Sequence, residues 1–118
     1  MLKDAKKGAY DRRTEDPARD PVPALKALAH PLRFALLELL AGGERCVCDL
    51  VDDIGASQPL VSHHLSVLKR AGLIRDRQDS TWVYYSVDAN NWEAFRRSLA
   101  DIRPVDVPSA PCPPGYGA

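Results

Sequence analysis

The sequence predicts a mainly α-helical domain that carries one small β-hairpin. Two observations support this prediction. Between residues 22 and 72, apolar residues recur three and four positions apart, as on the buried face of a helix. From Leu73 to Val87 the chain is instead rich in Ile, Val, Thr, Trp and Tyr, which favour strands. With 118 residues, 45% of them hydrophobic, the chain suits one domain with a small core.

Two helices are predicted at the start of this region. Leu25 and Leu28 mark a short helix that ends near His30. Pro31 fits the first turn of the next helix, where its missing N–H costs nothing. That helix has a broad apolar stripe at positions 32, 35, 36, 39 and 40, and the glycine pair at 42–43 ends it.

Two more helices follow, separated by only about three residues. The third helix is expected over residues 47–54, and Gly55 closes it. Ser57 is a suitable N-cap for the fourth helix, which ends at Gly72 and has its apolar side at Val61, Leu65 and Leu68. Two short helices joined by a tight, glycine-containing turn make a helix-turn-helix motif.

A hairpin and a last helix complete the predicted domain. Strands over 73–77 and 81–87 flank a turn at 78–80, and a hairpin directly after the second helix of this motif is a wing. The fold class is therefore a winged helix-turn-helix. Asp88 caps the last helix, whose narrow apolar seam fits packing either in a dimer or within one domain; the seam consists of Trp92, Phe95, Leu99 and Ile102.

The ends of the chain differ from this domain, which we expect over residues 22–103. Residues 1–21 read as a flexible charged arm, and residues 104–118 as a proline-rich tail. Because the chain has neither an apolar run of about 18 residues nor an apolar N-terminal segment, we expect a cytoplasmic protein without membrane contact. In that reducing compartment the three cysteines are expected to be thiols or metal ligands rather than a structural disulfide.

The fourth helix presents a polar face once its apolar side is buried. Gln, Ser and His side chains can read base edges, whereas Lys and Arg neutralise phosphates. A net charge of zero argues mildly against nucleic-acid binding, but residues 57–79 hold four basic and only two acidic side chains. We therefore predict a DNA-binding face rather than a merely solvated one, composed of Ser57, Gln58, Ser62, His63, Ser66, Lys69, Arg70, Arg75 and Arg77.

Three segments resemble the ArsR/SmtB family of metalloregulatory repressors. They are AHPLR at 29–33, SQPLVSHHL at 57–65 and LKRAGLI at 68–74, in the family's order and spacing. The resemblance covers about residues 24–102. It implies a homodimeric repressor that binds an imperfect palindrome in double-stranded operator DNA and is released by an inducing ion. It also implies a dimer interface on the first and last helices, with Leu25, Leu28, Trp92, Phe95, Leu99 and Ile102.

Cys46 and Cys48 match the thiolate motif of this family, which implies binding of a soft ion. The chemistry agrees, because a helix N-terminus favours thiolate and soft sulfur ligands select soft ions. Position 51 holds Val, the N-terminal arm holds no cysteine, and residues 88–103 hold no histidine. Compared with the family's other site patterns, this favours As(III) or Sb(III) as inducer, with cadmium, lead or another soft ion as the alternative.

Residues two apart in an ideal helix lie about 200° apart around the axis. We therefore expect Cys46 and Cys48 to converge on one ion only if the first turn bends or unwinds. Cys112 is either a third ligand or an uninvolved thiol, since the tail can extend about 28 Å to either subunit's pair. His64 lies near the buried side, where packing is favoured over metal binding.

Two other readings of these residues stay open. Cys46 and Cys48 can form a disulfide in a thiol-redox sensor on the same fold, or the chain can be a metal-binding module without a DNA function. The polar face of the fourth helix argues against the second reading. No acid–base constellation or cofactor loop is visible, so we expect no enzyme.

Overall fold

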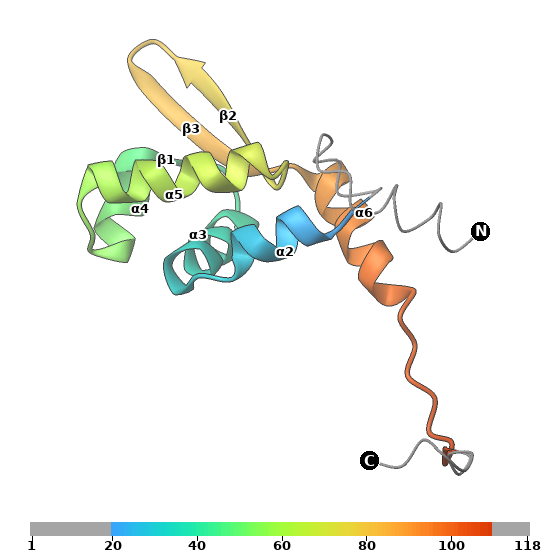
Figure 1. The fold of residues 1–118 in the computed structure, drawn as a ribbon. Helices are drawn as coiled ribbons and strands as arrows, with labels where there is room; N and C mark the ends of the chain where they lie inside the picture. The colour runs from blue at the N-terminus through green and yellow to red at the C-terminus, as the bar shows by residue number, and fades with distance from the viewer. Residues whose placement is uncertain (1–19, 110–118) are drawn as a thin grey trace.

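The computed structural model describes residues 20–109, which form five helices and a three-stranded antiparallel sheet (Figure 1). This arrangement confirms the predicted fold class. The elements are α2 (Val22–Leu28), α3 (Pro31–Ala41), β1 (Arg45–Cys46), α4 (Val47–Ile54), α5 (Gln58–Arg70), β2 (Ile74–Asp79), β3 (Trp82–Val87) and α6 (Ala89–Ala100). Among the described helices, none is long and apolar enough to cross a bilayer.

Local side-chain caps set the starts of three helices. Nδ1 of His30 accepts a hydrogen bond from the Leu32 N–H at 3.1 Å, and α3 begins at the following proline. Ser57 caps α5 through its hydroxyl, and Asp88 caps α6 through its carboxylate. These side chains satisfy N–H groups that have no partner inside their helices, which is why the helix starts are readable from the sequence.

A left-handed glycine makes the short turn between α4 and α5. Gly55 has φ 76° and ψ 26°, and its N–H donates to the Val51 carbonyl at 2.9 Å. A residue with a Cβ is strained in this conformation, whereas glycine adopts it freely. Because the turn spans only residues 55–57, α4 and α5 are held in the relative orientation of a helix-turn-helix motif.

The sheet has the order β1-β3-β2. The wing strands pair from Ile74↔Val87 to Asp79↔Trp82, so its loop consists of residues 80–81 and is shorter than the predicted turn at 78–80. Ser80 lies in that loop with a φ of 61°. Strand β1 was not predicted from the sequence, and it pairs Cys46 with Tyr84 at the other edge of β3.

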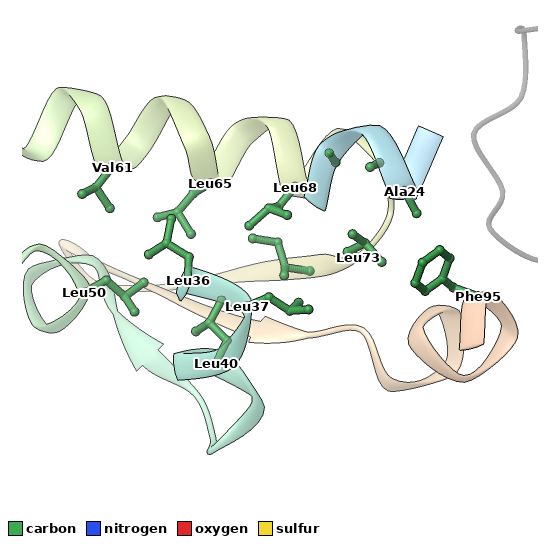
Figure 2. Close-up of a cluster of buried hydrophobic side chains, with 13 residues drawn as sticks. Ala24, Leu36, Leu37, Leu40, Leu50, Val61, Leu65, Leu68, Leu73 and Phe95 are labelled. Atoms are coloured by element: carbon green, nitrogen blue, oxygen red, sulfur yellow. The ribbon is translucent and has the colours of Figure 1, made fainter. Parts of the chain in front are cut away.

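The core lies beneath α5 and fixes its rotation. Figure 2 shows Val61, Leu65 and Leu68 pointing from α5 toward leucines of α3 and α4. All three are at most 1% exposed. Burying one such side chain contributes about 1.5–3 kcal/mol. Turning α5 about its axis would therefore expose several of them, and the opposite, polar face is held outward.

The expected seam on α6 does not form one stripe. Phe95 is 3% exposed and packs into the core of its own chain, so its assignment to the dimer interface was wrong. Ile102 lies beyond the end of α6 and is 72% exposed. Trp92 and Leu99 pack partly against the same core. The spacing alone did not distinguish packing within the domain from packing in a dimer, and for Phe95 the structure selects the former.

Candidate DNA-binding surface and cysteine pair

The exposed face of α5 carries most of the side chains predicted to contact DNA. Gln58, His63 and Ser66 are exposed, and Ser62 is half-buried. The Ser66 hydroxyl donates to the His63 carbonyl at 3.0 Å. That bond uses the hydroxyl hydrogen, so Ser66 can only accept a hydrogen bond from a DNA base. Ser57 is exposed but accepts from the Leu60 N–H at 3.4 Å, so its hydroxyl oxygen already caps the helix.

Two of the predicted phosphate-binding cations already have partners within the chain. Lys69 Nζ lies 2.9 Å from an Asp76 carboxylate oxygen, and this hydrogen bond raises the pKa of Lys69. Arg77 donates two hydrogen bonds to Glu44, at 3.0 and 2.7 Å, and these bonds lower the pKa of Glu44. Both pairs are exposed to solvent, where ion pairs are weak enough for a phosphate to replace the carboxylate.

Neither carboxylate partner was predicted from the sequence. Glu44 precedes β1 and lies 33 residues before Arg77, so only the pairing of β1 and β2 with β3 brings them together. Arg77 also lies over the Tyr84 ring, with its guanidinium carbon 4.7 Å from the ring centroid. Arg70 and Arg75 are exposed and, within residues 20–109, form no ion pair.

His64 packs against the chain's other two histidines. Its side chain is 6% exposed, and its ring centroid lies 4.4 Å from that of His30 and 5.2 Å from that of His63. Burial lowers the pKa of His64, and the nearby His30, Arg33 and His63 lower it further. His64 is therefore neutral at physiological pH and serves packing. Exposed His63 faces outward on α5.

Cys46 and Cys48 meet where a strand becomes a helix. Cys46 ends β1 and has the extended conformation, with φ −82° and ψ 160°, whereas Cys48 lies in the first turn of α4. Their Cα atoms are 5.4 Å apart, and the two sulfurs are joined as a disulfide. From the sequence, these cysteines were expected to be thiols or metal ligands whose sulfurs converge only if the first turn of a helix bends or unwinds. That expectation was wrong because Cys46 is not helical, so the sulfurs converge without any unwinding of α4.

Asp49 completes a group that sequence reasoning missed. One ligand atom from each of Cys46, Cys48 and Asp49 lies within 4.8 Å of the others. Sulfurs bound to one ion at about 2.3 Å are at most about 4.6 Å apart, so the spacing suits a single ion after reduction. The sequence does contain a sign of this third ligand, since an acidic residue directly follows Cys48. Cys112, which was considered as either a third ligand or an uninvolved thiol, lies outside the described residues.

The cysteine pair is connected to the DNA-binding face. Cys48 lines a cavity of about 220 Å³ together with Gln58, the first residue of α5, and Trp82 of the wing. Cys46 is 8% exposed, while Cys48 is open to solvent. A ligand on these sulfurs therefore lies beside both elements that are predicted to contact DNA.

Comparison with known proteins agrees with this geometry. Residues 30–76 match the family described as bacterial regulatory protein, arsR family. An uncharacterized HTH-type transcriptional regulator of Methanocaldococcus jannaschii is 46% identical over 65 residues, which is 53% of this chain and 73% of that protein. The arsenical resistance operon repressor of Escherichia coli is 42% identical over 66 residues, 55% of this chain and 56% of that protein.

A solved structure shares the fold. It is the homodimeric winged helix-turn-helix DNA-binding domain of a possible ArsR-family regulator from Mycobacterium bovis, determined in solution. It superposes with a TM-score of 0.58 at 32% identity and covers 68% of this chain and 77% of that domain. With its helix-turn-helix, its wing and these relatives, the chain belongs to the ArsR family of bacterial transcriptional regulators.

Proposed function

We propose that this protein is a homodimeric repressor that leaves its operator DNA when As(III) or Sb(III) binds Cys46 and Cys48. The observation that carries the proposal is the convergence of two sulfurs and the Asp49 carboxylate beside α5 and the wing. The similarity to the arsenical resistance operon repressor of Escherichia coli supports this choice of inducer.

The binding chemistry begins with the reduced pair. A dithiol reductant opens the disulfide and leaves two thiols at the start of α4. Arsenous acid, As(OH)₃, then exchanges two hydroxyls for the two sulfurs and releases two water molecules. Exposed Cys48 makes the first bond, and buried Cys46 closes the chelate. The third arsenic position is open to Asp49, to Cys112 or to a retained hydroxyl.

Release of DNA follows from where the sulfurs are anchored. Cys46 is paired with Tyr84 in the wing sheet, and Cys48 moves with α4, which packs on α5. An arsenic atom bound to both sulfurs fixes the distance between them, whereas in the reduced protein each sulfur moves with its own element. This changes the position of the wing relative to α5, and both must fit the DNA at once.

The deciding experiment measures release of a labelled promoter fragment by fully reduced protein. Arsenite is expected to release DNA from wild type, while Cys46→Ser and Cys48→Ser keep DNA binding and lose the response. The matched control is Ala100→Cys, which adds a thiol at the exposed end of α6, away from α5 and the wing, and restores nothing when combined with Cys46→Ser. Release of both single serine variants by arsenite would refute the assignment of the pair. If cadmium or lead but not arsenite releases wild type, the inducer class is wrong.

A second candidate function is favoured by one specific observation. Because the two sulfurs are joined as a disulfide, the same pair suits a thiol-redox sensor. An oxidant added to the reduced DNA complex, without any metalloid, tests this. Release by oxidant together with retention in arsenite identifies a redox sensor, and the reverse pattern identifies a metalloid sensor.

The dimer is proposed to form through α2 and α6, as the homodimeric relative suggests. Leu25 on α2 is 42% exposed in the single chain, which leaves an apolar side chain without cover. Leu25→Asp is expected to weaken association measured by sedimentation, because it places an unpaired charge in the interface. Leu60→Asp is the control, since Leu60 is also 42% exposed but lies on α5. Equal effects of the two changes would contradict this interface.

A further inference from the structure

A second cavity lies at the opposite end of α5 from the cysteine pair. It has a volume of about 320 Å³, is open to solvent, and is lined by α2, by Arg33 of α3 and by the last turn of α5. Figure 1 shows α2 beside the C-terminal half of α5, while the tip of the wing lies toward the other half. Nothing in the proposed sensing chemistry uses this cavity.

Among the described residues, the charged side chains that line this cavity all have the same sign. They are Lys26, Arg33 and Arg70, one from each of three helices, and no described lining residue is acidic. Within residues 20–109, none of the three forms an ion pair. Three cations that have no ion pair within this part of the chain repel one another, and a bound anion reduces that repulsion.

Arg33 supplies a second, independent observation. Its Nε is buried and has no hydrogen-bond partner among the described residues. A buried donor without a partner costs free energy, and native proteins avoid it. A carboxylate or phosphate oxygen in the cavity would be a partner for such a donor, and charge-assisted bonds to guanidinium are among the stronger hydrogen bonds.

We propose that this cavity binds a small organic anion, a carboxylate or a phosphate monoester with a short apolar part. Its volume lies at the lower end of the range of ligand pockets, about 300–1,000 Å³. Apolar side chains, among them Val22, Ala27 and Val67, complete the walls and suit a hydrocarbon group. A DNA backbone phosphate carries no such hydrocarbon group.

The test is calorimetric titration of the reduced full-length protein without DNA at constant ionic strength. Phenyl phosphate and benzoate are the two anionic probes, and benzyl alcohol is the neutral one. Saturable binding of one anion per chain is expected, with none for the alcohol, and comparing the two anions identifies the preferred head group. Arg33→Gln and Arg70→Gln are each expected to weaken binding at least tenfold. Arg103→Gln removes an exposed cation beyond α6 and should leave binding unchanged.

Three results would overturn the proposal. They are absence of saturable binding by either anion, equal weakening by Arg103→Gln, and retention of binding in both cavity variants. Arg70 is exposed, so its variant keeps the test valid if Arg33→Gln does not fold, and thermal unfolding followed by circular dichroism checks this. Because no DNA is present, a failure of the proposed repressor function would not affect this measurement.

Discussion

The two ends of α5 lie in different chemical surroundings. At its start, Gln58 shares a cavity with Cys48 and Trp82, and the neighbouring reactive groups are sulfurs. At its last turn, Arg70 shares a cavity with Lys26 and Arg33, and the neighbouring groups are positive charges. The helix between them is the one proposed to read DNA, and its buried side is a row of apolar residues. The sulfur pair and the three cations are thus separated by the length of α5, and the apolar core packs against the helix between them.

The largest effect on stability is expected from a substitution in the core beneath the middle of α5. Leu65 is 0% exposed and packs beneath α5 between its two ends. Leu65→Ala should lower the free energy of unfolding by about 2–5 kcal/mol, because it leaves a cavity in the core. Urea unfolding followed by circular dichroism measures this. Leu60→Ala, on the same helix but exposed, should change the value by less than about 0.5 kcal/mol. Similar losses in the two variants would mean that α5 is not fixed by this row.

The next largest effect is expected on operator binding, from substitutions on the polar side of α5 between its two ends. Gln58→Ala, Ser62→Ala and His63→Ala are each predicted to weaken operator binding, by about 1–3 kcal/mol where a good base contact is lost. Binding to unrelated DNA should change much less, since it depends on phosphate contacts. Fluorescence anisotropy with the operator and a scrambled duplex measures both. Unchanged operator affinity in all three variants would show that this face of α5 does not read bases.

A smaller, pH-dependent effect is expected from His64. Its pKa is lowered from 6.5 in the folded chain, chiefly by burial, so the unfolded chain binds more protons once the pH falls below about 6.5. The free energy of unfolding should therefore decrease as the pH falls through this region, and level off below the folded pKa. Denaturant unfolding between about pH 5 and 8 measures the slope, which should be shallower in His64→Leu. Parallel curves for wild type and variant would show that His64 does not contribute.

The smallest effect is expected at the wing. Glu44→Gln removes the charge of the carboxylate that holds Arg77 and leaves the Asp79 carboxylate, 3.7 Å away, as its acidic neighbour, which makes the guanidinium more available to a DNA phosphate. The slope of log affinity against log salt should then steepen by about one unit. Glu38→Gln removes an equal charge from an exposed residue that has no ion pair within the described part of the chain. If both variants give the same slope, the change reflects net charge and not the release of Arg77.

Features set by neighbouring residues could be predicted from the sequence. The starts of α3, α5 and α6 depend on caps at His30, Ser57 and Asp88, which lie next to the helices they begin. The turn before α5 depends on one glycine. The apolar row under α5 follows from helical spacing alone, and this row determines which side of the helix is polar.

Features set by distant partners could not be predicted. Strand β1 is two residues long and has no pattern of its own, and it exists because β3 has a free edge. Without β1, Cys46 is assigned to a helix and its geometry is wrong. The pairing of Arg77 with Glu44 likewise requires the sheet to form first. Phe95 has the same spacing whether it faces its own core or a partner, so its position needed the tertiary structure.

The cysteine pair occupies only three consecutive positions, yet it is attached to both the wing and α4. Under the proposed function, substitutions within this short segment would change which ion is held without altering the exposed face of α5. Inducer preference and operator preference are therefore free to diverge separately over evolution. The same separation offers a route for engineering. Exchanging residues 45–49 as a block would make a reporter that responds to a different ion while it acts on an unchanged promoter.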